Sequence, residues 1–219
     1  MTTLFIGNKN YSSWSMRPWL ALTWGGFAFE ERVLSLGMTG YGKSRQPAIL
    51  AASPSGRVPA LDLGGGVVIW DSMAICEWAA EQAPALYPQA PEARALCRAA
   101  AAEMHAGFTA LRKEAPMNVR RRTEQRAWSA DMRQDLARLE EMWSDLRARF
   151  GAGGPYLFGR RSIADAFYTP VATRFRTYGV TLSPPAQAYC EALLADRAFL
   201  AWEEAALAEP WAQPDIDGI

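Results

Sequence analysis

The architecture of this chain follows from one stretch, Ala52–Trp78, which reads ASPSGRVPALDLGGGVVIWDSMAICEW. Val58-Pro59 leads into the extended, partly alternating run 60–63, which predicts a strand. The glycines 64–66 permit a tight reversal, because glycine adopts positive φ without steric cost. The run 67–70 is rich in β-branched and aromatic residues and predicts the returning strand. A Gly-x-Val-Pro turn is therefore followed by a glycine hairpin.

A helix is predicted directly after this hairpin. Asp71-Ser72 precedes the apolar periodic run 73–80. Side-chain oxygens at such a boundary satisfy the free N–H groups of the first helical turn, and the helix start attracts an anionic ligand. We expect the turn, the hairpin and the helix start to form a backbone cradle for a small peptide.

The residues before this stretch complete one α/β unit. The runs 3–7 and 29–34 predict strands, and the helix that includes Met16–Leu22 is expected to have its N-terminus among the serines before it, with Pro18 in its first turn. Residues 43–52 predict a short irregular helix. The resulting order, β-α-β-α-β-β-α, is that of a thioredoxin-like domain.

The second half of the chain is predicted to be helical throughout. The segment 83–91 holds three prolines and predicts a linker between a domain over residues 1–83 and an all-helical domain over residues 92–219. Ser162 and Asp165 have the spacing of a capping box, which we interpret as structural. The expected helices cover residues 92–115, 123–150, a stretch from Ser162, 185–195 and 197–207.

The composition excludes several classes of function. Lys and Arg together number 23, as do Asp and Glu, which argues against nucleic-acid or membrane-surface binding. No apolar run is long enough to span a membrane, and we expect a cytoplasmic protein. Cys76, Cys97 and Cys190 form no Cys-x-x-Cys motif, so we expect buried free thiols and no metal site.

The cradle residues resemble those of cytosolic glutathione transferases. Members of that family carry a cis proline after a valine, and an acidic residue and a serine at the start of the third helix. The resemblance implies that Val58, ahead of Pro59, pairs through its backbone with the cysteinyl part of glutathione, and that Asp71 and Ser72 hold its γ-glutamyl end. It further implies the family's fold, an α/β thioredoxin-like N-terminal domain followed by an all-α helical C-terminal domain.

A cation is also required for the glycyl carboxylate of glutathione. Lys43 follows the glycine-bearing loop 37–42, and Arg57 lies just before Val58. Either side chain could reach that carboxylate. The alternative, at least as good for Lys43, is an exposed loop charge.

The chemistry is expected in the turn Tyr11–Pro18, YSSWSMRP. The glutathione thiol must ionise before it attacks an electrophile, and a free cysteine thiol has a pKa of about 8.5. A serine hydroxyl can donate a hydrogen bond to the thiolate, and the adjacent helix start adds positive potential. Lowering the pKa by about two units requires about 2.7 kcal/mol of preferential stabilisation of the thiolate.

Two serines compete for the role of donor. Aligned on the Ser-Ser-Cys-Ser-Trp-Arg turn of zeta-class enzymes, the catalytic residue is Ser12; aligned on theta-like enzymes, it is Ser13. We prefer Ser12. Trp14 replaces the zeta cysteine, and turn and helix-cap roles are the alternative for both serines. Arg17 is expected to pair with a carboxylate of its own domain.

The resemblance implies a glutathione transferase that delivers the thiolate to a small electrophile, with glutathione as co-substrate and no metal. Met104, His105 and Phe108 lie on the helix that borders the electrophile site in this family, although a lone helical histidine is more often a packing residue. A homodimer is expected by analogy. The alternatives are a glutathione-dependent isomerase or peroxide reductase, marked by cationic groups facing the sulfur, and a non-catalytic ligand-binding protein.

Overall fold

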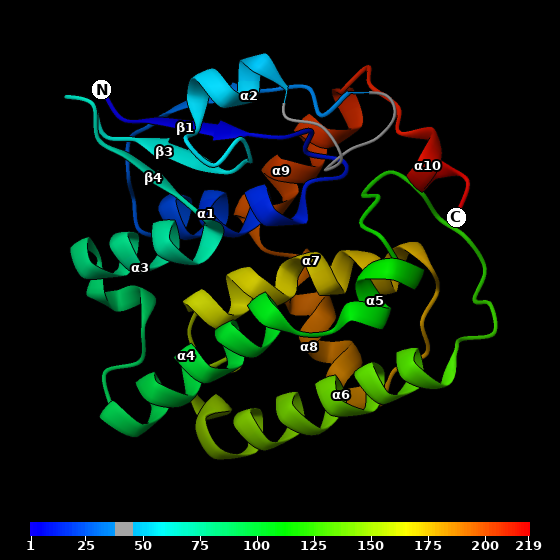
Figure 1. Cartoon of the computed structure of the whole chain (residues 1–219). Helices are drawn as coiled ribbons and strands as arrows, with labels where there is room; N and C mark the ends of the chain where they lie inside the picture. Colours follow the sequence, from blue (N-terminus) through cyan, green and yellow to red (C-terminus); the bar gives the residue numbers. More distant parts are fainter. Residues whose placement is uncertain (38–45) are drawn as a thin grey trace.

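The computed structural model describes residues 1–37 and 46–219, and its first part is a four-stranded sheet covered by helices. The strands are β1 (Thr3–Ile6), β2 (Glu30–Val33), β3 (Ala60–Asp62) and β4 (Val68–Trp70), in the order β2-β1-β3-β4. β1 pairs with β2 in parallel and with β3 antiparallel, and β3 pairs antiparallel with β4. Figure 1 shows helices α1 (Ser13–Trp24) and α3 (Ser72–Gln82) below the sheet and α2 (Pro47–Ala52) above it.

The first helix begins among the serines, as predicted. Ser12 caps α1, and its hydroxyl accepts the N–H of Ser15 at 3.3 Å, so the helix starts at Ser13. Pro18 consequently lies in the second turn, which corrects its expected place in the first. Because proline has no N–H, Pro18 cannot donate the helical hydrogen bond to the carbonyl of Trp14.

The rest of the described chain is helical, and Figure 1 shows α4, α5 and α6 beneath α7 and the sheet layer. Its α-helices are α4 (Pro91–Ala106), α5 (Thr109–Glu114), α6 (Ala130–Phe150), α7 (Ile163–Thr177), α8 (Pro184–Leu194), α9 (Arg197–Ala208) and α10 (Pro214–Asp217). Two short 3₁₀ turns, Pro84–Leu86 and Gly151–Gly153, complete the list of helical elements.

Two predicted helices are shorter than expected. The helix predicted over 92–115 is broken after Ala106, because Gly107 is extended and Phe108 adopts a left-handed conformation with φ 56°. The helix predicted over 123–150 begins only at Ala130, where the Ser129 hydroxyl caps it. Of the helix predicted over 43–52, residues 47–52 are helical and Lys43 lies outside the described residues.

Helix α7 is the centre of the molecule, since almost all of its side chains are buried and it contacts both α1 and α4. Its predicted capping box is confirmed: the Asp165 carboxylate accepts the backbone N–H of Ser162 at 2.8 Å, and the Ser162 hydroxyl accepts the backbone N–H of Asp165. Asp165 also accepts the hydroxyl of Tyr189 at 2.8 Å. Burial raises the pKa of the Asp165 carboxyl to about 6. α7 therefore ties the sheet layer to the helical layer.

The prediction of buried free thiols is confirmed. Cys76, Cys97 and Cys190 are buried free thiols. Within residues 1–37 and 46–219, none of the helices has the length and apolar character needed to cross a membrane.

Candidate active site

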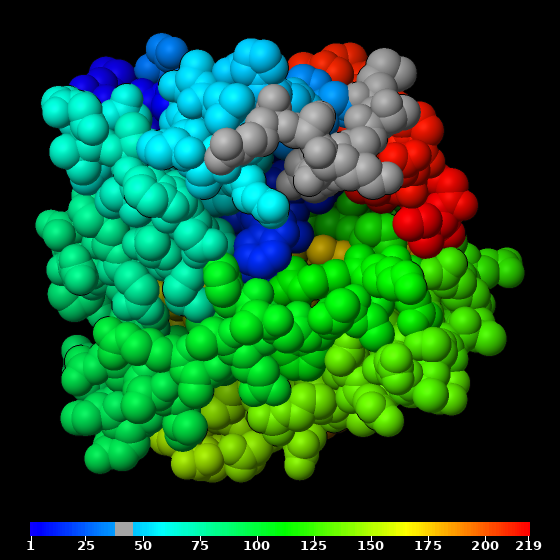
Figure 2. All heavy atoms as spheres, viewed as in Figure 1, coloured from blue at the N-terminus to red at the C-terminus, as the bar shows by residue number. Residues whose placement is uncertain are grey.

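The candidate site begins with the turn between β1 and α1. Its blue atoms are visible in Figure 2 between the cyan-to-teal segments and the green helices. The Ser12 hydroxyl donates to Ser15 Oγ at 2.7 Å and accepts the Ser15 N–H, and Ser15 Oγ accepts the N–H of Gly7 at 3.0 Å. The side chain of Ser12 is 1% exposed. Its proton is thus committed to a chain of hydrogen bonds inside the protein.

Ser13 is placed differently. It is the first residue of α1, and its Oγ accepts a hydrogen bond from Nη2 of Arg174 on α7 at 3.1 Å. Arg174 also donates to the carbonyl of Ala115 at 2.5 Å. A guanidinium group only donates, so this contact leaves the Ser13 proton available to another acceptor. Ser13 combines a free proton with the positive start of a helix.

Cationic side chains surround Trp14, the next residue. The guanidinium of Arg17 lies 4.2 Å from the Trp14 ring centroid, and that of Arg112 lies 4.8 Å from it. The His105 ring meets Trp14 edge-on at 5.2 Å. With Arg174, three arginines from α1, α5 and α7 gather at the turn. Among the described residues, none of the three forms an ion pair with a carboxylate.

The expectation that Arg17 pairs with a carboxylate of its own domain is wrong. Its side chain is fully buried between Trp14 and Phe167, at 4.2 and 4.6 Å, and Phe167 belongs to α7. All three guanidinium nitrogens are without a hydrogen-bond partner in the part of the chain described. Burial, reinforced by the charges of Arg112 and Arg174, holds the pKa of Arg17 well below its usual range. Burial likewise lowers the pKa of Arg174 to about 9.

The residues predicted to form the cradle lie just before β3 and at the start of α3. Val58 is buried, and its bond to Pro59 is cis, as the resemblance implied. Asp71, with φ 77°, caps α3 through Oδ1, which accepts the N–H of Met73 at 2.7 Å. Ser72 is 1% exposed, and its Oγ has no partner among the described residues. A buried hydroxyl without a partner at a helix start is suited to a polar ligand group.

His105 connects the helical layer to this cradle. Its Nε2 lies 3.5 Å from Oδ2 of Asp71, and its Nδ1 is buried without a described partner. Burial lowers the pKa of His105, the Asp71 carboxylate opposes that effect, and Arg17 and Arg112 add to it. His105 therefore lies against both Trp14 and Asp71, and its lowered pKa favours the neutral form; its contact with an electrophile stays a prediction.

The remaining predicted residues are placed less directly. Met104 and Phe108 belong to the hydrophobic core, and their contact with an electrophile stays a prediction. Arg57 is exposed beside Val58, and its role stays a prediction; Lys43 lies outside the described residues.

Arg112 and Arg174 were not predicted as site residues. The one available signal for Arg174 was a cation in the run 166–175 of α7, which is otherwise uncharged, because a charged residue is rarely buried without a partner. Arg112 lies in a short helix whose sequence carries no comparable signal. Neither residue is close in sequence to the turn that it reaches.

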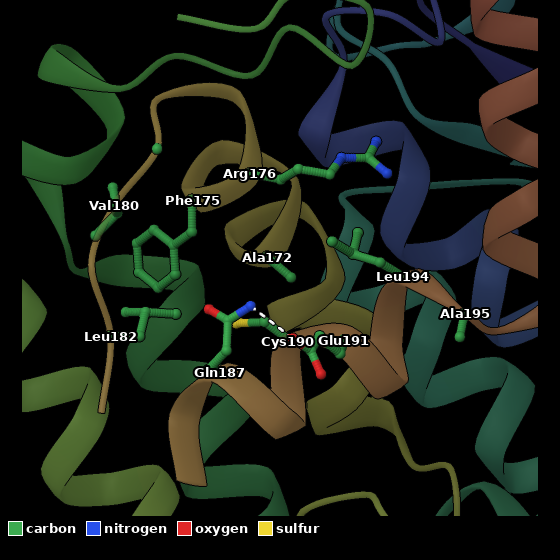
Figure 3. A pocket seen from close by; sticks show the side chains of 11 residues that line it. Ala172, Phe175, Arg176, Val180, Leu182, Gln187, Cys190, Glu191, Leu194 and Ala195 are labelled. Carbon is green, nitrogen blue, oxygen red and sulfur yellow. Dashed lines mark hydrogen bonds between the residues drawn. The ribbon is translucent and has the colours of Figure 1, made fainter. Parts of the chain in front are cut away.

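A separate cavity of about 530 Å³ lies between α7, the turn after it and α8. Figure 3 shows Phe175, Val180 and Leu182 on one side of it and the hydrogen bond between Gln187 and Glu191 at its floor. The residues that line this cavity belong neither to the turn between β1 and α1 nor to the cradle, so the cavity is distinct from the candidate site. No group of three possible metal-ligating side chains occurs in residues 1–37 and 46–219.

Comparison with known proteins identifies relatives of both halves. Residues 11–82 match the family model of the glutathione S-transferase N-terminal domain, and residues 122–205 match that of the C-terminal domain. The chain is 31% identical over 187 residues to a maleylacetoacetate isomerase of Pseudomonas aeruginosa, covering 82% of this chain and 84% of the relative.

Solved structures agree with these matches. A bacterial maleyl pyruvate isomerase, described as a zeta-class glutathione S-transferase, has 27% identity and a TM-score of 0.69, over 95% of this chain and 98% of that one. A glutathione transferase homologue from Burkholderia, solved with bound glutathione, has 22% identity and a TM-score of 0.69, over the same shares. At that identity, the second likeness shows the fold alone.

Proposed function

This chain belongs to the glutathione S-transferase family, and from that premise we propose that it binds glutathione and ionises its thiol at the start of α1. The thiolate then attacks a small electrophile held between the sheet layer and the helical layer. The observation that carries the proposal is the contact of Arg174 with Ser13, which presents a hydroxyl proton at a helix start rich in positive charge.

The cradle supports glutathione as the thiol. The unpartnered Ser72 Oγ and the carboxylate of Asp71 lie where the family holds the γ-glutamyl end, beside the N–H groups at the start of α3. The backbone of Val58 lies next to the cis bond, as expected for pairing with the cysteinyl part. The residues present therefore fit the ligand.

We assign the donor role to Ser13 in preference to Ser12. The Ser12 proton already bonds to Ser15, whereas Ser13 accepts from Arg174 and has its own proton to donate. A hydrogen bond to a charged group contributes about 1.5–3 kcal/mol, and the helix start and the nearby guanidinium groups add to it. Together these supply the roughly 2.7 kcal/mol that a pKa about two units lower requires.

A glutathione-dependent isomerase is the second candidate, and one observation favours it. Cationic groups, Arg17, Arg112 and Arg174, cluster at the turn without carboxylate partners, as suits an anionic substrate. Two relatives, one curated and one of known structure, are isomerases by name. A thiolate that adds to a conjugated double bond leaves a single bond free to rotate, and its departure restores both the double bond and glutathione. We further propose a cytoplasmic homodimer, by analogy with the family.

Ultraviolet titration of the bound glutathione thiol tests the proposal. We expect a pKa below the free value in the wild type and in Ser12→Ala, and a return towards the free value in Ser13→Ala. Glutathione binding without any lowering of the thiol pKa would contradict the proposal and favour a non-catalytic ligand-binding protein. The two catalytic candidates differ in stoichiometry, since conjugation consumes one glutathione per turnover and isomerisation consumes none.

A further inference from the structure

We propose that Glu209 and Asp217 are positioning residues that hold the catalytic turn from the opposite end of the chain. They bound the segment 209–217, here called the C-terminal strap, which follows α9 and includes α10. Figure 1 shows α10 on the side of the molecule where the loop before α1 meets the segment after α5. The catalytic meaning of the strap rests on the proposed function, whereas its contact with the turn is independent of that function.

Glu209 holds the backbone immediately before the serines. Its two carboxylate oxygens accept the N–H groups of Lys9, at 2.6 Å, and Asn10, at 3.1 Å. The side chain is buried, so these are charge-assisted bonds shielded from water. This loop has no regular secondary structure of its own to satisfy those N–H groups. Glu209, which lies 200 residues further along the chain, therefore supplies the hydrogen-bond acceptors that a neighbouring strand would otherwise provide.

Asp217 holds the next residue of the turn. It accepts the hydroxyl of Tyr11 at 3.0 Å and the side-chain amide of Asn118 at 2.7 Å. Tyr11 in turn accepts the backbone N–H of Gln213 at 3.1 Å. Tyr11 thus directs its hydroxyl to the strap.

Arg120 joins the strap and the turn to the helical layer. Its guanidinium donates to the carbonyls of Glu209, at 2.8 Å, and Trp211, at 2.6 Å. Its backbone N–H donates to Oδ1 of Asn10 at 2.9 Å. Figure 2 shows the red C-terminal atoms lying against the green segment that contains Arg120. Three segments distant in sequence therefore meet at one loop.

The strap can affect the chemistry because it helps to fix the positions of Ser12 and Ser13. The backbone N–H of Ser12 bonds to the carbonyl of Asn8 at 2.8 Å, so a shift of the loop moves the serines. Ser13 must remain within hydrogen-bond reach of Arg174, which is anchored on α7. Small misplacements of a catalytic group lower rates steeply without abolishing binding. The strap lies beyond residues 122–205, which the family's C-terminal model matches.

The test compares Glu209→Gln with Glu204→Gln, which neutralises an exposed carboxylate on α9. In Glu209→Gln one acceptor becomes a donor that faces a backbone N–H. We expect a fall in kcat of about tenfold, a KM for glutathione within about twofold of wild type, and a raised pKa of the bound thiol. We also expect faster hydrogen exchange in the peptide that covers residues 8–16, and no such change in Glu204→Gln.

Asp217→Asn provides a second route, since it weakens the bond to Tyr11 from the exposed end of the strap. A lower melting temperature with unchanged kcat, thiol pKa and exchange at residues 8–16, in whichever variant folds, would overturn the inference. The exchange measurement separates the two proposals. If glutathione bound to the wild-type protein shows no lowered thiol pKa, the proposed function fails. Hydrogen exchange of residues 8–16 in the variants still decides whether the strap holds the turn.

Discussion

Arg174 donates a hydrogen bond to Ser13 across the boundary between the two layers, from α7 to the first residue of α1, over 3.1 Å. Under the proposed function, this bond would give the helical layer a part in the thiol chemistry. It also distinguishes Ser13 from Ser12, whose hydroxyl is committed to Ser15.

Arg174→Met is expected to raise the pKa of the bound thiol by about one unit, because it removes one charge-assisted bond worth about 1.4 kcal/mol. The apolar stem of methionine keeps most of the packing. Titration of the thiol measures the change. Arg176→Met is the matched control, since Arg176 lies on the same helix and pairs with Glu203. An equal shift in both variants would contradict a specific role for Arg174.

Arg17→Met is expected to leave the free energy of unfolding unchanged or to raise it by about 1–3 kcal/mol, since it replaces an unpaired buried cation with an apolar side chain. The same change removes positive charge beside Trp14 and should raise the pKa of the bound thiol. Denaturant unfolding and thiol titration measure the two effects. Arg149→Met, an exposed ion-pair variant, should change stability by less than about 0.5 kcal/mol. A loss of stability in Arg17→Met would show that the guanidinium has an acceptor.

Ser72→Ala is expected to weaken glutathione binding by about tenfold or more, because a hydrogen bond to a charged group contributes about 1.5–3 kcal/mol. Its effect on stability should be small, since Ser72 Oγ has no partner in the described chain. Isothermal titration and thermal unfolding measure the two quantities. Ser162→Ala, which breaks the capping box, should show the reverse pattern. Unchanged affinity in Ser72→Ala would remove Ser72 from the cradle.

Asp165→Asn is expected to destabilise the fold by about 2–4 kcal/mol, because the carboxylate accepts buried bonds from Leu157, Ser162 and Tyr189. Burial raises the pKa of Asp165 from 3.8 to about 6, so the folded state binds the proton more tightly than the unfolded state. Protonation of Asp165 therefore adds fully to the free energy of unfolding below about pH 4, and this addition is lost as the pH rises to about 6.

The amide of the variant does not titrate, so the stability difference between wild type and Asp165→Asn should narrow as the pH rises through this window. Unfolding by denaturant at several pH values measures it. A difference that stays constant from about pH 4 to about pH 7 would show that Asp165 is ionised throughout.

Local features were predicted well because their causes lie within a few residues. The hairpin over residues 60–70, the helix start at Asp71 and the capping box of Ser162 each follow from glycine conformation, side-chain periodicity or a hydrogen bond between near neighbours. The errors are local as well. The breaks at Phe108 and before Ala130 occur at Gly107 and at the Ser129 cap, two local signals that the periodic apolar pattern obscured.

The sequence alone predicted the family fold, the cradle residues and the turn that carries the serines, since those signals lie in consecutive residues. Tertiary structure alone decided which serine has a free proton, where the charge of Arg17 lies, and that Arg112, Arg174 and the strap reach the turn. Those relationships join residues about a hundred or more positions apart, and no spacing along a chain encodes the direction of a side chain across such a distance.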